Sequence, residues 1–213
     1  MKQRGEGTTF DFRALLEKQN RTRLAVVLGG AAMLLLLLSE LLPATPPAEP
    51  SAASASQASA YREQLEAQLD KLAEGDILIL AGSIPSSLPQ TTYERLLARL
   101  EGHGVHTVVD ATRDLLVNVL QYHPFLIKPN NFELGEIFGV PLKDDVDEIV
   151  RYAGKLQEMG ARNVLVSMAG DGAVLLDENG GVHACGVCKG TVKNSVGAGD
   201  SMVAGFVAGC ETG

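Results

Sequence analysis

The residue types best suited to chemistry lie near the C-terminal end, in residues 194–201, which read NSVGAGDS. Gly197 and Gly199 flank Ala198, Asp200 follows at once, and the small apolar residues behind them predict a buried helix. A glycine-rich turn that opens a helix leaves backbone N–H groups unpaired, and with the helix dipole these form an anion site. An aspartate in such a site is suited to accept a proton from a hydroxyl group that attacks a phosphoryl group held by those N–H groups.

The same stretch also fits a purely structural interpretation. The glycines would then allow close packing of a helix, and Asp200 would be an ordinary acidic residue in its first turn. A single G-x-G-D match does not decide between the two interpretations, so motifs in the rest of the chain are needed to distinguish them.

Charge is unevenly distributed along the 213 residues, of which 46% are hydrophobic and which carry a net charge of −8. Residues 1–23 contain six Lys/Arg and three Asp/Glu, and the remainder contains twelve and twenty-three. Because the larger part is acidic, nucleic acid is not expected as a partner.

Residues 24–42 are apolar enough to predict a transmembrane helix. They read LAVVLGGAAMLLLLLSELL, with Glu40 near the far end. A cleaved signal peptide and a buried soluble helix are the alternatives. The basic residues before the run would keep the N-terminus in the cytoplasm, so the chain would be membrane-anchored with a single pass. Residues 43–60, mostly Pro, Ala and Ser, predict a flexible linker.

From residue 61 onward, apolar runs alternate with amphipathic runs. The predicted helices cover residues 61–75, 90–101, 112–121, 131–138 and 145–159. The predicted strands cover residues 76–81, 105–110, 125–128, 163–168, 173–177 and 182–187. Alternation of strands and helices predicts an α/β fold with a parallel sheet, helices on both faces and ligands at the carboxyl ends of the strands.

Several polar or glycine residues follow those strand ends. Gly82 and Ser83 follow the first strand, and Asp110 ends the second, where it could simply be a helix N-cap. Asn130 and Glu133 follow the third, where oxygen ligands would suit Mg²⁺ with its waters, although a helix capping box would explain them equally.

The cysteines suggest no disulfide framework. Cys185 and Cys188 form one C-x-x-C with His183 before it, and a zinc site would need a second ligand pair, which the sequence does not provide. Two small strand residues are the simpler interpretation, and Cys210 is expected to pack in a helix.

Four motifs, in this order, resemble the PfkB family of ribokinase-like carbohydrate kinases, and within it the 1-phosphofructokinase branch. They are GSIP at 82–85, N-x-x-E at 130–133, SMAGDGA at 167–173 and NSVGAGDSMVAGF at 194–206. The resemblance covers residues 62–213 and implies a kinase domain that phosphorylates a sugar phosphate, such as fructose 1-phosphate, with ATP and Mg²⁺. The family is cytoplasmic, and the oligomeric state stays open.

The resemblance implies a role for each matching residue. Asp200 would be the catalytic base, and the N–H groups of Gly197, Ala198 and Gly199 would form the anion hole. Glu133 would serve Mg²⁺ through water. The nucleotide would lie near Lys128, Asn130, Ser167, Gly170 and Gly172, and the sugar would lie near Gly82 and Ser83.

Residues 1–60 do not match that family and resemble instead the membrane-anchored N-terminus of stage III sporulation protein AG. This resemblance leaves open a non-enzymatic, membrane-anchored assembly component or a chimeric gene product as the alternative. With no substrate-binding half before residue 61, we expect slow sugar phosphorylation, an unpaired sheet edge and nucleotide binding through Gly170 and Gly172.

Overall fold

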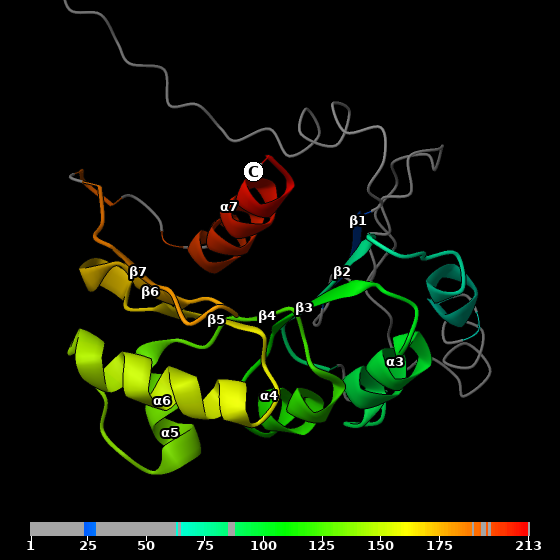
Figure 1. Cartoon of the computed structure of the whole chain (residues 1–213), viewed down its shortest axis with the longest axis horizontal. Helices are drawn as coiled ribbons and strands as arrows, with labels where there is room; N and C mark the ends of the chain where they lie inside the picture. Colours follow the sequence, from blue (N-terminus) through cyan, green and yellow to red (C-terminus); the bar gives the residue numbers. More distant parts are fainter. Residues whose placement is uncertain are drawn as a thin grey trace, which may run out of the picture.

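The computed structural model describes residues 24–28, 63, 65–84, 88–188, 190–192, 195 and 197–212. Within them the chain forms one seven-stranded sheet in which the strands lie in sequence order, β1 to β7. Figure 1 shows helices α3, α4, α5 and α6 on one face of this sheet and α7 on the other. The predicted α/β fold with helices on both faces is therefore confirmed.

The seven strands fall into a parallel part and a hairpin part. Strands β1 to β5 are parallel, whereas β5, β6 and β7 pair antiparallel. The parallel part contains the strands that alternate with helices, and the short connections after β5 and β6 can join only antiparallel neighbours. The strands are β1 (Leu24–Leu28), β2 (Ile77–Ala81), β3 (His106–Asp110), β4 (Leu126–Ile127), β5 (Asn163–Ser167), β6 (Ala173–Leu176) and β7 (Val182–Cys185).

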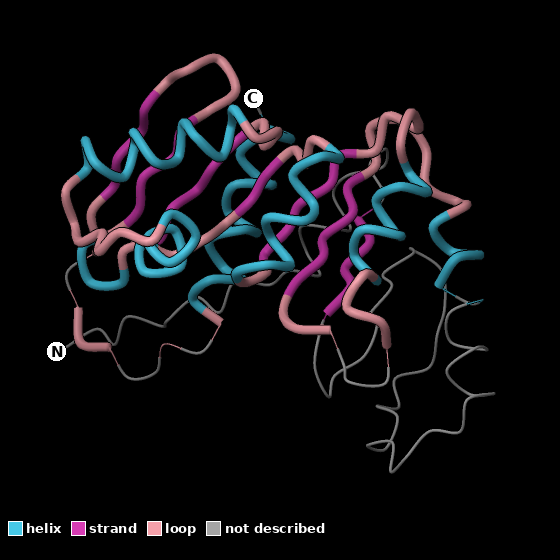
Figure 2. Tube along the Cα trace, turned by 90° about the horizontal axis from the view of Figure 1, so that it is seen from below, coloured by secondary structure: helices cyan, strands magenta, loops and turns pink. Residues whose placement is uncertain are grey.

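The helices agree closely with the amphipathic runs of the sequence, and Figure 2 shows them lying across the strands. The predicted helix at 61–75 is shorter, since only residues 63 and 65–69 are described as helical before turns begin. The elements are α3 (Thr92–Leu100), α4 (Arg113–Val119), α5 (Asn131–Phe138), α6 (Val146–Glu158) and α7 (Ala198–Thr212), with 3₁₀ turns η1 (Leu120–Tyr122) and η2 (Ala169–Asp171).

The first five residues of the predicted transmembrane helix form a strand instead. β1 (Leu24–Leu28) pairs with β2 in parallel, with Leu24 opposite Ile77. A membrane helix over 24–42 is therefore wrong at its start, and residues 29–42 lie outside the described residues. A short apolar run suits a buried parallel strand as well as a helix, which is why the pattern misled.

The β1–β2 pairing also corrects the expectation that the edge of β2 would be unpaired. In the part of the chain that the structure describes, no helix is both long and apolar enough to cross a membrane. The predicted linker at 43–60 lies outside the described residues.

Each face of the sheet has its own hydrophobic core. On one face, α3 to α6 pack over buried residues such as Leu78, Leu80 and Val109. On the other, Val203 and Val207 of α7 pack against a second cluster. Both faces of β2 are thus covered, and all five of its residues are buried. This double cover fixes α7, and with it the glycine-rich turn, against the sheet.

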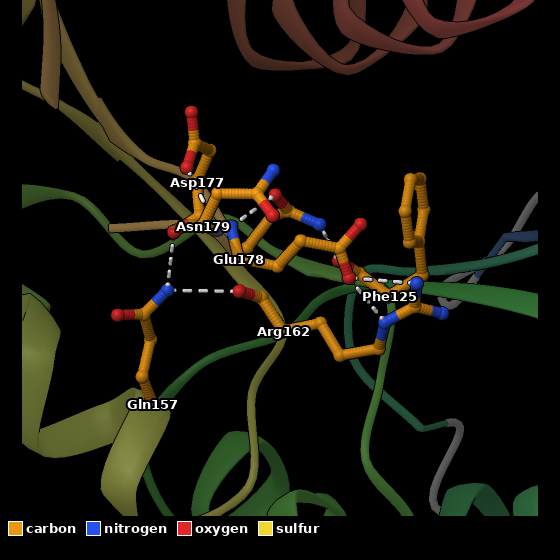
Figure 3. A network of polar contacts seen from close by, with 7 residues as sticks. Phe125, Gln157, Arg162, Asp177, Glu178 and Asn179 are labelled. Atoms are coloured by element: carbon orange, nitrogen blue, oxygen red, sulfur yellow. Dashed lines mark hydrogen bonds and ion pairs between the residues drawn. The ribbon is translucent and has the colours of Figure 1, made fainter. Parts of the chain in front are cut away.

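A polar network ties the hairpin to the amino ends of β4 and β5. The amide of Gln157 donates to the carbonyls of Arg162 (2.8 Å) and Asp177 (2.9 Å), as Figure 3 shows. The guanidinium of Arg162 bonds to Glu178 at 2.7 Å and lies over the ring of Phe125, 5.0 Å from its centroid. These contacts lie at the edge opposite to the carboxyl ends of the parallel strands and serve to hold the sheet together.

Gly160, which follows α6, offers a test of this packing. Its φ is +132°, and an added Cβ would lie 2.1 Å from the carbonyl oxygen of Leu120. We expect Gly160→Ala to lower the free energy of unfolding by about 2 kcal/mol, from backbone strain and steric overlap together. Urea denaturation measures this loss.

The matched control is Gly139→Ala at the end of α5. Gly139 has φ +65° but nothing within 4 Å of an added Cβ, so only strain applies. Its expected loss is about 1 kcal/mol. Equal losses at the two positions would contradict the close approach of Gly160 to Leu120.

Candidate active site

The loops that follow the parallel strands are joined to one another by backbone hydrogen bonds. Gly82, with φ +84°, donates its N–H to the carbonyl of Asp110 at 2.9 Å. Tyr93 of α3 donates its hydroxyl to the carbonyls of Ala81 (3.0 Å) and Gly82 (3.2 Å). Burial, with a contribution from the Asp110 charge, raises the pKa of Tyr93 to about 12, so it remains a donor. The turn at Gly82 is thus held in place beside Asp110.

A buried ion pair stands at the centre of this edge. The ammonium of Lys128, just after β4, lies 3.2 Å from Oδ1 of Asp110 at the end of β3. The Lys128 side chain is 9% exposed and that of Asp110 is 21% exposed. Burial raises the pKa of Asp110, the Lys128 charge opposes that rise, and the charge of Asp200 adds to it. The ion pair of Asp110 and Lys128 is therefore also influenced by the charge of Asp200, in the first turn of α7.

The first turn of α7 lies against this pair. An added Cβ on Gly199 would be 3.2 Å from Nζ of Lys128 and 3.9 Å from Oδ2 of Asp110. Gly197, just before the helix, has φ +79°, a conformation that glycine adopts without strain. The N-terminus of α7 and the Lys128 ammonium thus lie together and can hold an anion. Asp200 follows Gly199 in the same helical turn and supplies a carboxylate that can accept a proton.

The start of α5 is fixed by a complete capping box. The side chain of Asn130 accepts from the N–H of Glu133 at 2.8 Å, and Oε2 of Glu133 accepts from the N–H of Asn130 at 2.8 Å. The structural interpretation of this motif is therefore confirmed. It does not compete with a metal role, because the second carboxylate oxygen of the half-buried Glu133 is not used in the box.

The residues present fit Mg²⁺ held mainly by water. Mg²⁺ keeps several waters and binds few protein oxygens. Within the described ranges no group of three or more His, Cys, Asp or Glu side chains is arranged to hold a metal. The second carboxylate oxygen of Glu133 is a protein oxygen of the kind that Mg²⁺ uses, and water would occupy its other coordination positions.

The loop after β5 is narrow and tightly built. The N–H of Met168 donates to the carbonyl of Gly172 at 2.8 Å, closing the turn that contains Gly170. Gly172 has φ +97°, and an added Cβ would lie 2.0 Å from the carbonyl oxygen of Cys185 on β7. On the other side, Ser167 forms a bridge with Asn130. The loop thus stands between the capping box and the hairpin.

The structure brings most of the predicted site residues to one edge of the sheet. Contacts join the Gly82 turn, Lys128 and the first turn of α7 through Asp110. Asn130 and Ser167 form a second pair, and only Pro129 separates Asn130 from Lys128 in the sequence. Ser83 is exposed.

Asp110 is the residue whose importance the sequence left undecided. A helix N-cap role was the structural alternative for Asp110, but Thr112 occupies the N-cap position of α4, and its side chain makes no cap bond. One feature of the sequence could have indicated a functional role for Asp110. It ends one predicted strand, and Lys128 ends the next predicted strand, so both lie at the carboxyl edge of the sheet.

Comparisons with known proteins agree with this geometry. Residues 49–213 match the pfkB family carbohydrate kinase profile. This chain belongs to the PfkB family of carbohydrate kinases. The match begins inside the segment expected to be a linker, so the family-like part starts before residue 61.

Two curated relatives show the breadth of the likeness. The 1-phosphofructokinase of Bacillus subtilis is 51% identical over 142 residues, which are 67% of this chain and 46% of that protein. A D-tagatose-1-phosphate kinase of Bacillus licheniformis is 33% identical over 154 residues, 72% of this chain and 50% of that protein. The chain spans about half the length of the curated relatives it matches.

The fold of this chain is similar to that of a solved kinase structure. It is phosphofructokinase-2 from Escherichia coli in complex with substrates and products, with a TM-score of 0.62 and 28% identity. The likeness covers 67% of this chain and 46% of that one. The kinase resemblance seen in the sequence motifs is confirmed at the level of family and fold.

Proposed function

We propose that this chain provides the nucleotide and phosphoryl-transfer site of an ATP-dependent sugar-phosphate kinase, with a ketose 1-phosphate such as fructose 1-phosphate as acceptor. The observation that carries the proposal is the meeting of the α7 N-terminus with the Lys128–Asp110 pair. A fixed cation beside a helix N-terminus suits a transferring phosphoryl group, whose charge must be stabilised where it develops.

Asp200 is the base in this proposal. Its carboxylate accepts the proton of the attacking sugar hydroxyl as the new oxygen–phosphorus bond forms and the bond to the ADP oxygen breaks. The N–H groups of Gly197, Ala198 and Gly199 hold the phosphoryl oxygens in this proposal. The N–H of Ala198, which donates to the carbonyl of Ser195 at 3.1 Å, would exchange that bond for one to the phosphoryl group. The ammonium group of Lys128 adds positive charge beside the phosphoryl group, and its ion pair with Asp110 fixes the position of that ammonium group.

ATP would lie along the loops that follow β4 and β5. Gly170 and Gly172 allow close approach of the backbone to a nucleotide, with Ser167 and Asn130 beside them. Mg²⁺, when bound through water at Glu133, would neutralise charge on the phosphate groups. Gly82 and Ser83 would face the sugar.

The choice of acceptor follows the names of the relatives. Both the Bacillus subtilis and the Bacillus licheniformis proteins are named for kinases of a sugar 1-phosphate. The acceptor proposed for this chain therefore carries a phosphate group at position 1 and a hydroxyl group that is free to attack.

Two helix caps provide a matched test of the metal and nucleotide part. Asn130 caps α5, and Asp145 caps α6 by accepting from two N–H groups. We expect Asn130→Ala and Asp145→Ala each to lower the free energy of unfolding by about 1 kcal/mol, the usual value of an N-cap. Only Asn130→Ala should also weaken binding of ATP in the presence of Mg²⁺, by about tenfold.

Isothermal titration calorimetry with ATP, in Mg²⁺ and in EDTA, measures this difference. The expected pattern is that Mg²⁺ strengthens ATP binding in the original chain and in Asp145→Ala but not in Asn130→Ala. The same Mg²⁺ dependence in all three proteins would show that the α5 cap is structural only. No ATP binding by the original chain would refute the proposal.

A further inference from the structure

The β6–β7 hairpin lies beside the Met168–Gly172 turn, which is part of the proposed nucleotide loop. The hairpin and the segment that follows it carry two exposed thiols. Cys185 is the last residue of β7, Cys188 follows three positions later, and both are exposed. Figure 1 shows β7 beside β6 at one edge of the sheet, and all four β7 residues are exposed. Both thiols are therefore accessible to small oxidants.

The sequence between the thiols can form the turn that a disulfide needs. A disulfide brings two Cα atoms to about 4.4–6.8 Å, and a four-residue β-turn brings its ends within about 7 Å. The four residues are Cys-Gly-Val-Cys, and Gly186 stands at the second position, where a type II′ turn requires glycine. In the reduced chain residues 186–188 form no turn. Oxidation therefore requires this segment to bend.

The bend would start at a point of contact with the nucleotide loop. The carbonyl oxygen of Cys185 occupies the space that a Cβ on Gly172 would need. Cys185 is also paired with Ala173 in the β6–β7 ladder. A change in the backbone at Cys185 therefore acts directly on the Met168–Gly172 turn.

We propose that Cys185 and Cys188 form a reversible dithiol–disulfide switch that alters the loop between β5 and β6. In the oxidising step the thiolate of one cysteine attacks a small-molecule disulfide such as oxidised glutathione and releases one thiol. The second cysteine then attacks the mixed disulfide and releases the other, so the chain loses two electrons and two protons and two small thiols form. Weaker ATP binding in the oxidised form is the part that rests on the proposed function.

The first experiment identifies the bond. The full chain is equilibrated in glutathione buffers of increasing oxidised fraction, trapped with N-ethylmaleimide and weighed as the intact protein. The three cysteines should give three adducts when reduced and one, on Cys210, when oxidised. Cys185→Ser and Cys188→Ser should lose the two-thiol step, whereas Cys210→Ser, the matched exposed thiol on α7, should keep it. Stable glutathione adducts on Cys185 or Cys188 in place of the internal bond would overturn the proposal.

The second experiment measures the consequence without relying on activity. Hydrogen exchange at the N–H of Gly172 and its neighbours should rise at least fivefold on oxidation, and Cys188→Ser should show no change. The Kd for ATP should rise at least threefold in the oxidised chain, which means weaker binding. If exchange changes but ATP binds neither form, the switch stands and the proposed function fails. If the bond forms and exchange is unchanged, the switch is refuted.

Discussion

Asp200→Asn is expected to lower the rate of phosphoryl transfer from ATP to fructose 1-phosphate by about 10²–10⁴-fold, the usual contribution of a general base. The amide has nearly the same shape as the carboxylate, so the turn and its N–H groups remain. It cannot accept the hydroxyl proton at neutral pH. ATP affinity should therefore stay within about threefold while the chemical step slows.

The measurement is single-turnover transfer of radiolabelled phosphate with the protein in excess over ATP, which detects slow transfer. Asp114→Asn is the matched control, because Asp114 is also an exposed acidic residue in the first turn of a helix. It should transfer phosphate as fast as the original chain. If Asp200→Asn behaves like Asp114→Asn, then Asp200 is an ordinary first-turn acid and not the base.

Lys128→Met is expected to lower the free energy of unfolding at pH 7 by about 3 kcal/mol, the lower end of the range for breaking a buried ion pair. The lower end applies because the Asp110 side chain is 21% exposed. Methionine keeps most of the volume of the lysine stem, so the loss comes mainly from leaving the Asp110 carboxylate without its partner.

The pH dependence of this loss follows from the pKa of Asp110. Burial already raises that pKa, and removing Lys128 removes the charge that opposes the rise. A carboxyl whose pKa is higher in the folded than in the unfolded state penalises folding above its folded pKa. The penalty disappears once the pH falls below the unfolded value. The deficit of Lys128→Met should therefore shrink as the pH falls from 7 towards 4.

Urea denaturation at several pH values measures the deficit. Lys143→Met, at an exposed lysine, should change stability by no more than about 0.5 kcal/mol at any pH. Adding Asp110→Asn to Lys128→Met should restore part of the loss at pH 7. A deficit that is independent of pH would mean that packing of the lysine stem, and not its charge, is what stabilises the fold.

The sequence predicted the elements that alternate regularly and missed what depends on tertiary pairing. Helix α5 (Asn131–Phe138) lies where the pattern placed it, because its start and end carry local signals, the Asn130 box and Gly139. The apolar pattern at Leu24–Leu28 predicts part of a membrane helix and not the observed strand, since a run of five apolar residues has no periodicity that separates the two. Its partner lies about fifty residues further on, which no local pattern reveals.

The site divides in the same way. Glycine-rich turns can be recognised from the sequence alone, so the sequence predicts the turns at Gly82, Gly172 and Gly197. The role of Asp110 required knowing that β3 and β4 are neighbours, because only then do Asp110 and Lys128 meet. The assignments of catalytic, nucleotide and metal roles to individual residues remain predictions until the variants above are measured.

The order of the strands has a consequence for how the chain is made. From β2 to β7 each strand pairs with the one before it in the sequence, so each can be added to the growing sheet as it leaves the ribosome. The β1–β2 pair has the longest stretch of chain between its strands, so Leu24 can pair only after Ile77 has been synthesised. At about 5–20 residues per second this wait lasts several seconds. During that time the apolar residues of β1 cannot form their pairing with β2, and transiently exposed apolar segments are what chaperones bind.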